Sequence, residues 1–137
     1  MAASHDVLPA PDERSRPFFE GARDGRLVLQ RCRACRTWLH PVRKRCTRCG
    51  GAEIDWAQAS GRARLYSWGR LHRAYLPQHQ GRLPIDLAVV DLEEGVRMST
   101  NLVGAQPSEI RAGMALEVDF ERVSPDVAIP VFRPARS

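Results

Sequence analysis

The chain has 137 residues and a mass of 15.4 kDa, which suits one compact unit or two small ones and is too little for a multidomain enzyme. Hydrophobic residues make up 43% and charged residues 27%, a balance that excludes a fibrous repeat and wholesale disorder. The net charge of +5 is local, because eight cations and no carboxylate lie between Gly25 and Ala52, so the rest of the chain is net negative.

Residues 1–14 are predicted to form a flexible arm, because Pro9 and Pro11 interrupt them and they show no apolar periodicity. This arm has no apolar run of the length that a secretory signal requires. No apolar run elsewhere approaches the roughly 20 residues of a membrane-spanning helix. We therefore expect a cytoplasmic protein that does not bind membranes.

A short helix is predicted directly after the arm. Ser15 can cap this helix, Pro17 is tolerated in its first turn, and Gly25 can end it. The adjacent Phe18 and Phe19 present more apolar surface than so short a helix can bury by itself. They either pack on the rest of the chain or dock on another protein, and the sequence leaves both alternatives open.

The four cysteines, Cys32, Cys35, Cys46 and Cys49, form two C-x2-C pairs separated by ten residues. In a cytoplasmic protein this doubled spacing is typical of a metal site. Two such turns supply the four thiolates of a closed, tetrahedral zinc site, which leaves no open position for a catalytic water. The alternatives are redox-active dithiols, a disulfide, or a rubredoxin-like iron site on the same ligands. We predict structural zinc.

The surroundings of the cysteines carry two further signals. Gly50 follows Cys49 where the chain must reverse, whereas Arg36 follows Cys35, where glycine would be commoner. The cations around the cysteines can offset the negative charge of a zinc ion with four thiolates. They can equally form a surface that meets an anionic ligand or partner.

Residues 51–60 are predicted to be a connector, and strands follow from Gly61. The first strand lies within residues 61–76, and a hairpin runs through 85–92, a turn at 93–95 and a return at 96–103. A turn ends at Gly113, residues 114–123 alternate as a strand, and a final strand at 128–132 contains Pro130 and should be an edge. Five short strands in about 70 residues fit a small Greek-key barrel of the OB type.

The expected architecture is therefore a small, mainly β protein. A helix and a rubredoxin-like zinc ribbon occupy residues 15–59, and a five-stranded OB-fold barrel occupies residues 60–137.

In order and spacing, several short motifs resemble a known family from about Pro17 to Phe132. The family joins an N-terminal rubredoxin-like zinc ribbon to a C-terminal OB-fold; it was long classed as a domain of unknown function and has since been tied to acyl-CoA metabolism. The shared motifs are Gly25-Arg26-Leu27, Cys32-x2-Cys35, His40-Pro41-x-Arg43, Cys46-x2-Cys49-Gly50, Ser60-Gly61, residues 91–97, residues 100–104 and residues 110–114. Arg36, in place of glycine, and Thr47, where proline is frequent, depart from the family pattern.

The resemblance implies an accessory subunit. Family members form complexes with larger thiolase-like, aldolase-like or MaoC-type hydratase subunits that act on acyl-CoA thioesters. The sequence agrees with a non-catalytic role, because it contains no evident nucleophile or base motif and no glycine-rich phosphate loop.

Two groups of residues outside the cysteines are candidates for contacts with ligand or partner. Cations and one aromatic on the first barrel strand could meet the phosphates and adenine of CoA: Arg62, Arg64, Arg70, Arg73 and Trp68. Phe18, Phe19 and Phe132 could form a partner interface. The competing function is a single-stranded nucleic-acid binder, which the acid-rich barrel segment disfavours.

Overall fold

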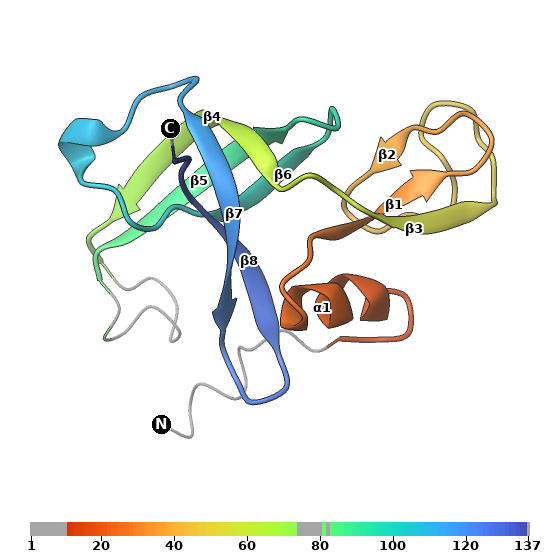
Figure 1. The fold of residues 1–137 in the computed structure, drawn as a ribbon, viewed down its shortest axis with the longest axis horizontal. Helices are drawn as coiled ribbons and strands as arrows, with labels where there is room; N and C mark the ends of the chain where they lie inside the picture. The colour runs from red at the N-terminus through yellow and green to blue at the C-terminus, as the bar shows by residue number, and fades with distance from the viewer. Residues whose placement is uncertain (1–10, 74–80, 82, 137) are drawn as a thin grey trace.

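A three-stranded ribbon sheet and a five-stranded barrel sheet lie side by side, with one helix at the base of both (Figure 1). The computed structural model describes residues 11–73, 81 and 83–136. Most of the predicted arm and residues 74–76 of the first predicted barrel strand lie outside this range. In the described part of the chain, no helix is long and apolar enough to cross a membrane.

Helix α1 (Arg16–Arg23) begins at Ser15 and is followed by Gly25 with a φ of 77°. Pro17 lies in its first turn, as predicted. Ser15 occupies the N-cap position of α1, as predicted, but its side chain forms no capping hydrogen bond. Ser15 instead exchanges bonds with the preceding turn, because the Asp12 carboxylate accepts from the Ser15 N–H at 2.9 Å and the Asp12 N–H donates to the Ser15 hydroxyl at 3.1 Å.

The ribbon sheet has the order β2-β1-β3, with β1 (Val28–Cys32) between β2 (Trp38–Leu39) and β3 (Ile54–Gln58). The prediction of a connector over residues 51–60 is wrong, because β3 pairs with β1 in antiparallel register from Cys32↔Ile54 to Val28↔Gln58. In this strand only Ile54 and Trp56 are large apolar residues in alternation with polar ones. Two such residues are too few to distinguish a strand from a loop in the sequence.

The barrel sheet contains β4 (Arg62–Leu71), β5 (Ile85–Leu92), β6 (Arg97–Asn101), β7 (Ala115–Arg122) and β8 (Ala128–Pro134). A single turn of 3₁₀ helix, η3 (Pro107–Glu109), lies between β6 and β7. The order is β6-β5-β4-β7-β8 with antiparallel neighbours throughout. These five strands confirm the predicted OB-fold.

The two ends of the barrel sheet meet where β6 ends. β8 is terminal in the order, as its proline predicts. Leu102 nevertheless forms a parallel bridge to Phe132, and the Val103 N–H donates to the Phe132 carbonyl at 2.8 Å. Strand β6 ends at Asn101, and the Leu102 N–H still donates to the Asp86 carbonyl of β5 at 3.0 Å. Leu102 thus bonds to β5 and also bridges to β8, which closes the barrel.

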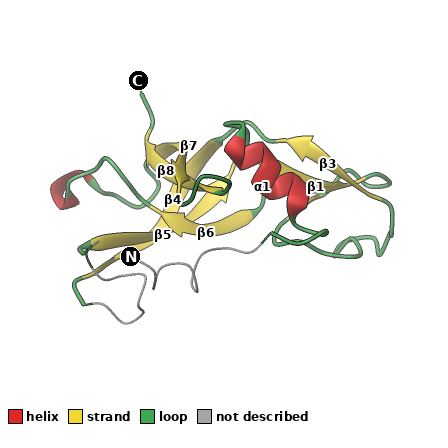
Figure 2. Ribbon diagram, turned by 90° about the horizontal axis from the view of Figure 1, so that it is seen from below, coloured by secondary structure: helices red, strands yellow, loops and turns green. Residues whose placement is uncertain are grey.

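One apolar core connects the ribbon to the barrel. Leu27 and Leu29, from the start of the ribbon, cluster with barrel residues such as Leu65 and Phe132. Helix α1 packs against β1, β7 and β8, and Figure 2 shows it alongside β1. The core thus crosses the boundary expected at residue 59.

Phe132 is fully buried in this core, with 0% of its surface exposed. The prediction that Phe132 belongs to a partner interface is therefore wrong. Its position near the C-terminus suggested exposure, but the β8 backbone turns its side chain inward, where it fills the centre of the closed barrel.

Candidate metal centre

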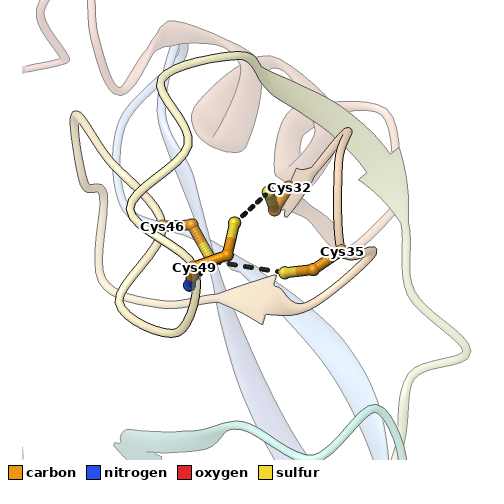
Figure 3. A group of neighbouring side chains, drawn as sticks. All are labelled: Cys32, Cys35, Cys46 and Cys49. Carbon is orange, nitrogen blue, oxygen red and sulfur yellow. Dashed lines mark hydrogen bonds between the residues drawn. The ribbon is translucent and has the colours of Figure 1, made fainter.

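The four cysteines converge at the tip of the ribbon (Figure 3). Their sulfur atoms all lie within 4.8 Å of one another, with Cys32 and Cys49 at 3.6 Å and Cys35 and Cys46 at 3.5 Å. Sulfurs about 2.3 Å from a central zinc ion in tetrahedral geometry are about 3.8 Å apart. The arrangement therefore fits one tetrahedral metal ion held by four protein ligands.

The two cysteine turns have the same backbone geometry. In the first turn the Arg36 N–H donates to the Cys32 carbonyl at 2.9 Å and the Cys32 N–H donates to the Thr37 carbonyl at 2.8 Å. In the second turn the Gly50 N–H donates to the Cys46 carbonyl at 3.0 Å and the Cys46 N–H donates to the Gly51 carbonyl at 2.9 Å. Each turn thereby aims two sulfurs at one point, which is why the doubled C-x2-C spacing predicted the site.

Arg36 occupies the strained position of the first turn. Its φ is 67°, and the equivalent Gly50 of the second turn has a φ of 78°. A side chain in this left-handed conformation costs about 1–2 kcal/mol relative to glycine. Arg36, which replaces the glycine expected from the sequence, therefore introduces local backbone strain. The other interactions of the ribbon offset its cost.

Replacing this residue should stabilise the ribbon. We expect Arg36→Gly to raise the free energy of unfolding of the metal-loaded chain by about 1 kcal/mol, because glycine adopts the observed φ without strain. Arg36→Ala is the matched control, since it removes the same charge but keeps the β-carbon. Chemical denaturation of both variants measures the difference, and equal stability of the two would show that φ at this position carries no strain.

The thiols do not ionise equally. The Thr37 hydroxyl, 3.1 Å from the Cys35 sulfur, lowers the pKa of that thiol to about 6. Backbone N–H groups of Cys49 and Arg48 lower the pKa of Cys46. The Gly51 N–H acts in the same direction on Cys49, but the neighbouring sulfurs outweigh it and raise the pKa of Cys49 to about 11. Four thiolates this close would repel one another, and a divalent metal at their centre would offset this charge.

Little else holds the ribbon tip together. The apolar cluster there consists of the buried Cys32, Leu39 and Cys46, with Cys35 and Ile54 packed against them. So small a core cannot order two turns without a bound metal.

Gln30 links the core to the loop between the two cysteine turns. It is 6% exposed, its amide nitrogen donates to the Arg43 carbonyl at 3.0 Å, and its amide oxygen accepts from the Arg43 N–H at 2.7 Å. Sequence reasoning missed this residue. The available signal was a polar amide directly after the apolar residues that begin the strand. Such a residue does not by itself reveal a hydrogen-bond partner thirteen residues away.

The loop held by Gln30 carries cations that have no carboxylate partner among the described residues. Arg43, Lys44, Arg45 and Arg48 are all exposed, and no salt bridge joins them to the rest of the described chain. Arg33, on the other side of the ribbon, is instead paired with Glu53 and Asp55. Among the described residues, the loop 43–48 therefore holds the largest group of ribbon cations without a salt bridge, and Arg31 and Arg36 are further ones.

The barrel arginines predicted to contact CoA are mostly engaged with the chain itself. Arg62 makes a two-pronged salt bridge to Glu93 at 2.6 and 2.9 Å, and Arg70 makes one to Asp86 at 2.6 and 2.7 Å. Arg64 donates to the Gly113 carbonyl at 3.1 Å. Paired arginines of this kind do not form the continuous cationic groove that single-stranded nucleic acid requires.

The same residues do not share one face of the sheet. A register shift between Leu65 and Ser67 reverses the alternation of β4, so Arg64 lies opposite Asp91 whereas Trp68 lies opposite the buried Ala88. Trp68 is 37% exposed, and Arg73 is exposed beyond the end of β4. Their contact with an anion stays a prediction, and the structure does not bring the five residues together.

Phe18 and Phe19 line a small cavity between α1 and the ribbon, here called the ribbon cavity. The two rings meet edge to face with their centres 5.1 Å apart, and Phe18 stacks on His40 at 5.9 Å. Burial of His40 lowers its pKa. The cavity measures about 180 Å³, and Val42 and Trp56 contribute further walls. Phe18 also packs against the common core, so the first of the two predicted alternatives holds for this residue.

Known protein families match both parts of this architecture. The ChsH2 rubredoxin-like zinc ribbon domain matches residues 19–55, and the ChsH2 C-terminal OB-fold domain matches residues 56–121. A chain of the Ltp2-ChsH2(DUF35) aldolase is 38% identical and superimposes with a TM-score of 0.82 over 93% of this chain and 98% of that one.

Two relatives carry functional names. A DUF35 domain-containing scaffold protein of Methanocaldococcus jannaschii is 30% identical over 73% of this chain and 71% of that protein. A probable enoyl-CoA hydratase alpha subunit of Thermomonospora curvata is 39% identical over 93% of this chain. This chain spans only 39% of the length of that hydratase subunit.

Proposed function

The chain belongs to the DUF35 family of ChsH2-type zinc ribbon and OB-fold proteins, and from this we infer that it is a non-catalytic accessory subunit of a larger acyl-CoA enzyme. The partner would be an aldolase-like, thiolase-like or hydratase subunit acting on acyl-CoA thioesters. One observation carries the proposal: the likeness to a chain of the Ltp2-ChsH2(DUF35) aldolase covers 98% of that chain.

The chemistry of the described residues supports an accessory role. All four cysteines point into one cluster with the geometry of a closed metal site. His40 is stacked on Phe18 and half-buried, which is the environment of a structural side chain. The larger subunit would therefore supply the nucleophile or base.

We propose that the metal is zinc. Cys32, Cys35, Cys46 and Cys49 would hold it, and the ion would stabilise the two turns rather than take part in a reaction. Thiolates that bind metal need a reducing compartment, so we place the protein in the cytoplasm.

Affinity purification of the tagged chain from its own host tests the proposal. We expect a larger acyl-CoA enzyme subunit to be recovered in fixed stoichiometry. The purified chain alone should show no turnover of acyl-CoA thioesters, whereas the recovered complex should be active. A Cys46→Ser variant, with its metal site broken, is the control for specific recovery. Turnover by the partner-free chain at an enzymatic rate, or recovery of no enzyme subunit, would contradict the proposal.

A further inference from the structure

The ribbon cavity has the size and lining of a pocket for one side chain. It lies where α1 faces the ribbon sheet, and Figure 2 shows this helix directly beside β1. Its walls are almost wholly apolar and include Phe18, Phe19, Val42 and Trp56. Sites for small molecules usually measure about 300–1,000 Å³. A volume of about 180 Å³ is below that range, so it suits a single large apolar side chain rather than a cofactor.

The walls of this cavity are held in place before anything binds. Phe18 is fixed by its edge-to-face contact with Phe19 and by its stacking on His40. Val42 is 36% exposed and its neighbour Pro41 is also exposed, whereas Phe18, Phe19 and Trp56 are partly buried. Rigid apolar pockets with one accessible edge are where the anchoring residues of protein interfaces bind.

A run of exposed cations directly follows the cavity wall in the sequence. Gln30 lines the cavity and binds both backbone groups of Arg43, so the loop that begins at Val42 is fixed to the cavity wall. Arg43, Lys44 and Arg45 follow in direct succession and are exposed, with no salt bridge to the rest of the described chain. The chain thus runs from an apolar pocket directly into a basic loop, in which the Arg45 guanidinium donates to the Gly50 carbonyl at 3.2 Å.

We propose that the ribbon cavity receives one apolar side chain from an acidic segment of the larger partner subunit, while Arg43, Lys44 and Arg45 pair with carboxylates that flank this side chain. The inference rests on the proposed function, because it requires a protein partner. An apolar anchor provides affinity and the charged rim provides orientation and fast association. Phe18 and Phe19 would then form walls of the pocket that receives the partner's side chain. They would not be the groups that insert into the partner.

Three synthetic peptides test this assignment by NMR on the zinc-loaded, ¹⁵N-labelled chain. The first has a central phenylalanine flanked by three glutamates on each side, the second has alanine at the centre, and the third has lysines as flanks. The first peptide should shift the amide signals of Phe19 and Val42 and the indole signal of Trp56. The alanine peptide should bind at least about tenfold more weakly, as the loss of an interface anchor does. The lysine peptide should cause no shifts.

Variants locate the site. Val42→Phe fills the cavity from its own wall and should abolish the shifts, whereas Leu87→Phe, at a similarly exposed apolar residue of β5, should leave them unchanged. Replacing Arg43, Lys44 and Arg45 together by glutamate should reverse the preference, so that the lysine-flanked peptide binds. The folded state of each variant is checked by the dispersion of its barrel signals.

The proposal is overturned if the phenylalanine peptide causes no shifts at millimolar concentration, if the alanine peptide binds equally well, or if Val42→Phe binds like the native chain. It is also overturned if coenzyme A, rather than the peptide, shifts the cavity signals. Failure of the proposed function is a different result: the tagged chain would recover no enzyme subunit, whatever the peptides do. A recovered complex whose affinity is unchanged by Val42→Phe would refute only the present inference.

Discussion

Cys46→Ser should abolish tight metal binding and unfold the tip of the ribbon. Cys46 is buried in a cluster that contains little besides the cysteines, Leu39 and Ile54, so nothing replaces the lost metal bonds. Structural zinc contributes about 10–16 kcal/mol in zinc-finger peptides, which is more than so small a core can supply. The barrel should stay folded, because Leu27 and Leu29, the buried ribbon residues of its core, precede both cysteine turns. Trp38, between the turns, also packs against this core but is only partly buried.

Metal analysis and hydrogen exchange check this prediction together. The native chain should contain one zinc per molecule, and the variant less than half an equivalent. Amides of residues 32–51 should lose their protection in the variant, while those of β4 and β5 keep it. Thr47→Ser is the matched control, because Thr47 is an exposed neighbour of Cys46 and its hydroxyl is retained. Retention of a full equivalent of zinc by the variant, or unfolding of the whole chain, would contradict the expectation.

Phe132→Ala should be the most damaging substitution in the barrel. The side chain is fully buried at the point where β6 and β8 meet, and truncation leaves a cavity that the closed sheet cannot collapse around. Losses of this kind cost about 3–5 kcal/mol. Leu87→Ala, at a side chain that is 42% exposed on β5, is the control and should cost far less. Equilibrium denaturation of the metal-loaded variants measures both values.

The same variant distinguishes a core residue from an interface residue. If Phe132 were an anchor for a partner, its loss would weaken the complex and leave the free chain as stable as before. The buried position predicts the reverse, with a large fall in the stability of the free chain. Affinity should then change only as far as folding does.

Patterns that repeat within a short stretch were sufficient to predict much of the fold. The doubled cysteine spacing correctly predicted that the four cysteines cluster, because two similar turns aim their sulfurs at one point. The run 85–92 and its return were predicted as a hairpin, since alternation and Gly95 lie close together in the sequence. Pro130 correctly placed the final strand at the end of the sheet order.

Features that depend on distant partners could not be predicted. Strand β3 forms because its backbone pairs with β1, whereas its own residues show almost no alternation of apolar and polar side chains. The register shift in β4 separates Arg64 from Trp68 on the two faces, although simple alternation would place both on one. Phe132 looked exposed because nothing local to it reveals that β6 returns to cover it.

The core shared by the ribbon and the barrel limits how this protein can be recombined. Leu27 and Leu29 belong by sequence to the ribbon but by packing to the barrel. A ribbon exchanged with that of a relative at residue 59 would therefore bring foreign side chains into the barrel interior. Chimeras joined between Leu29 and Cys32 on β1, and again after β3, would keep the buried interior. They would change the metal-binding tip, its basic loop and Trp38, which packs against that interior. Partner choice could thus diverge within such a family while the barrel remains the same.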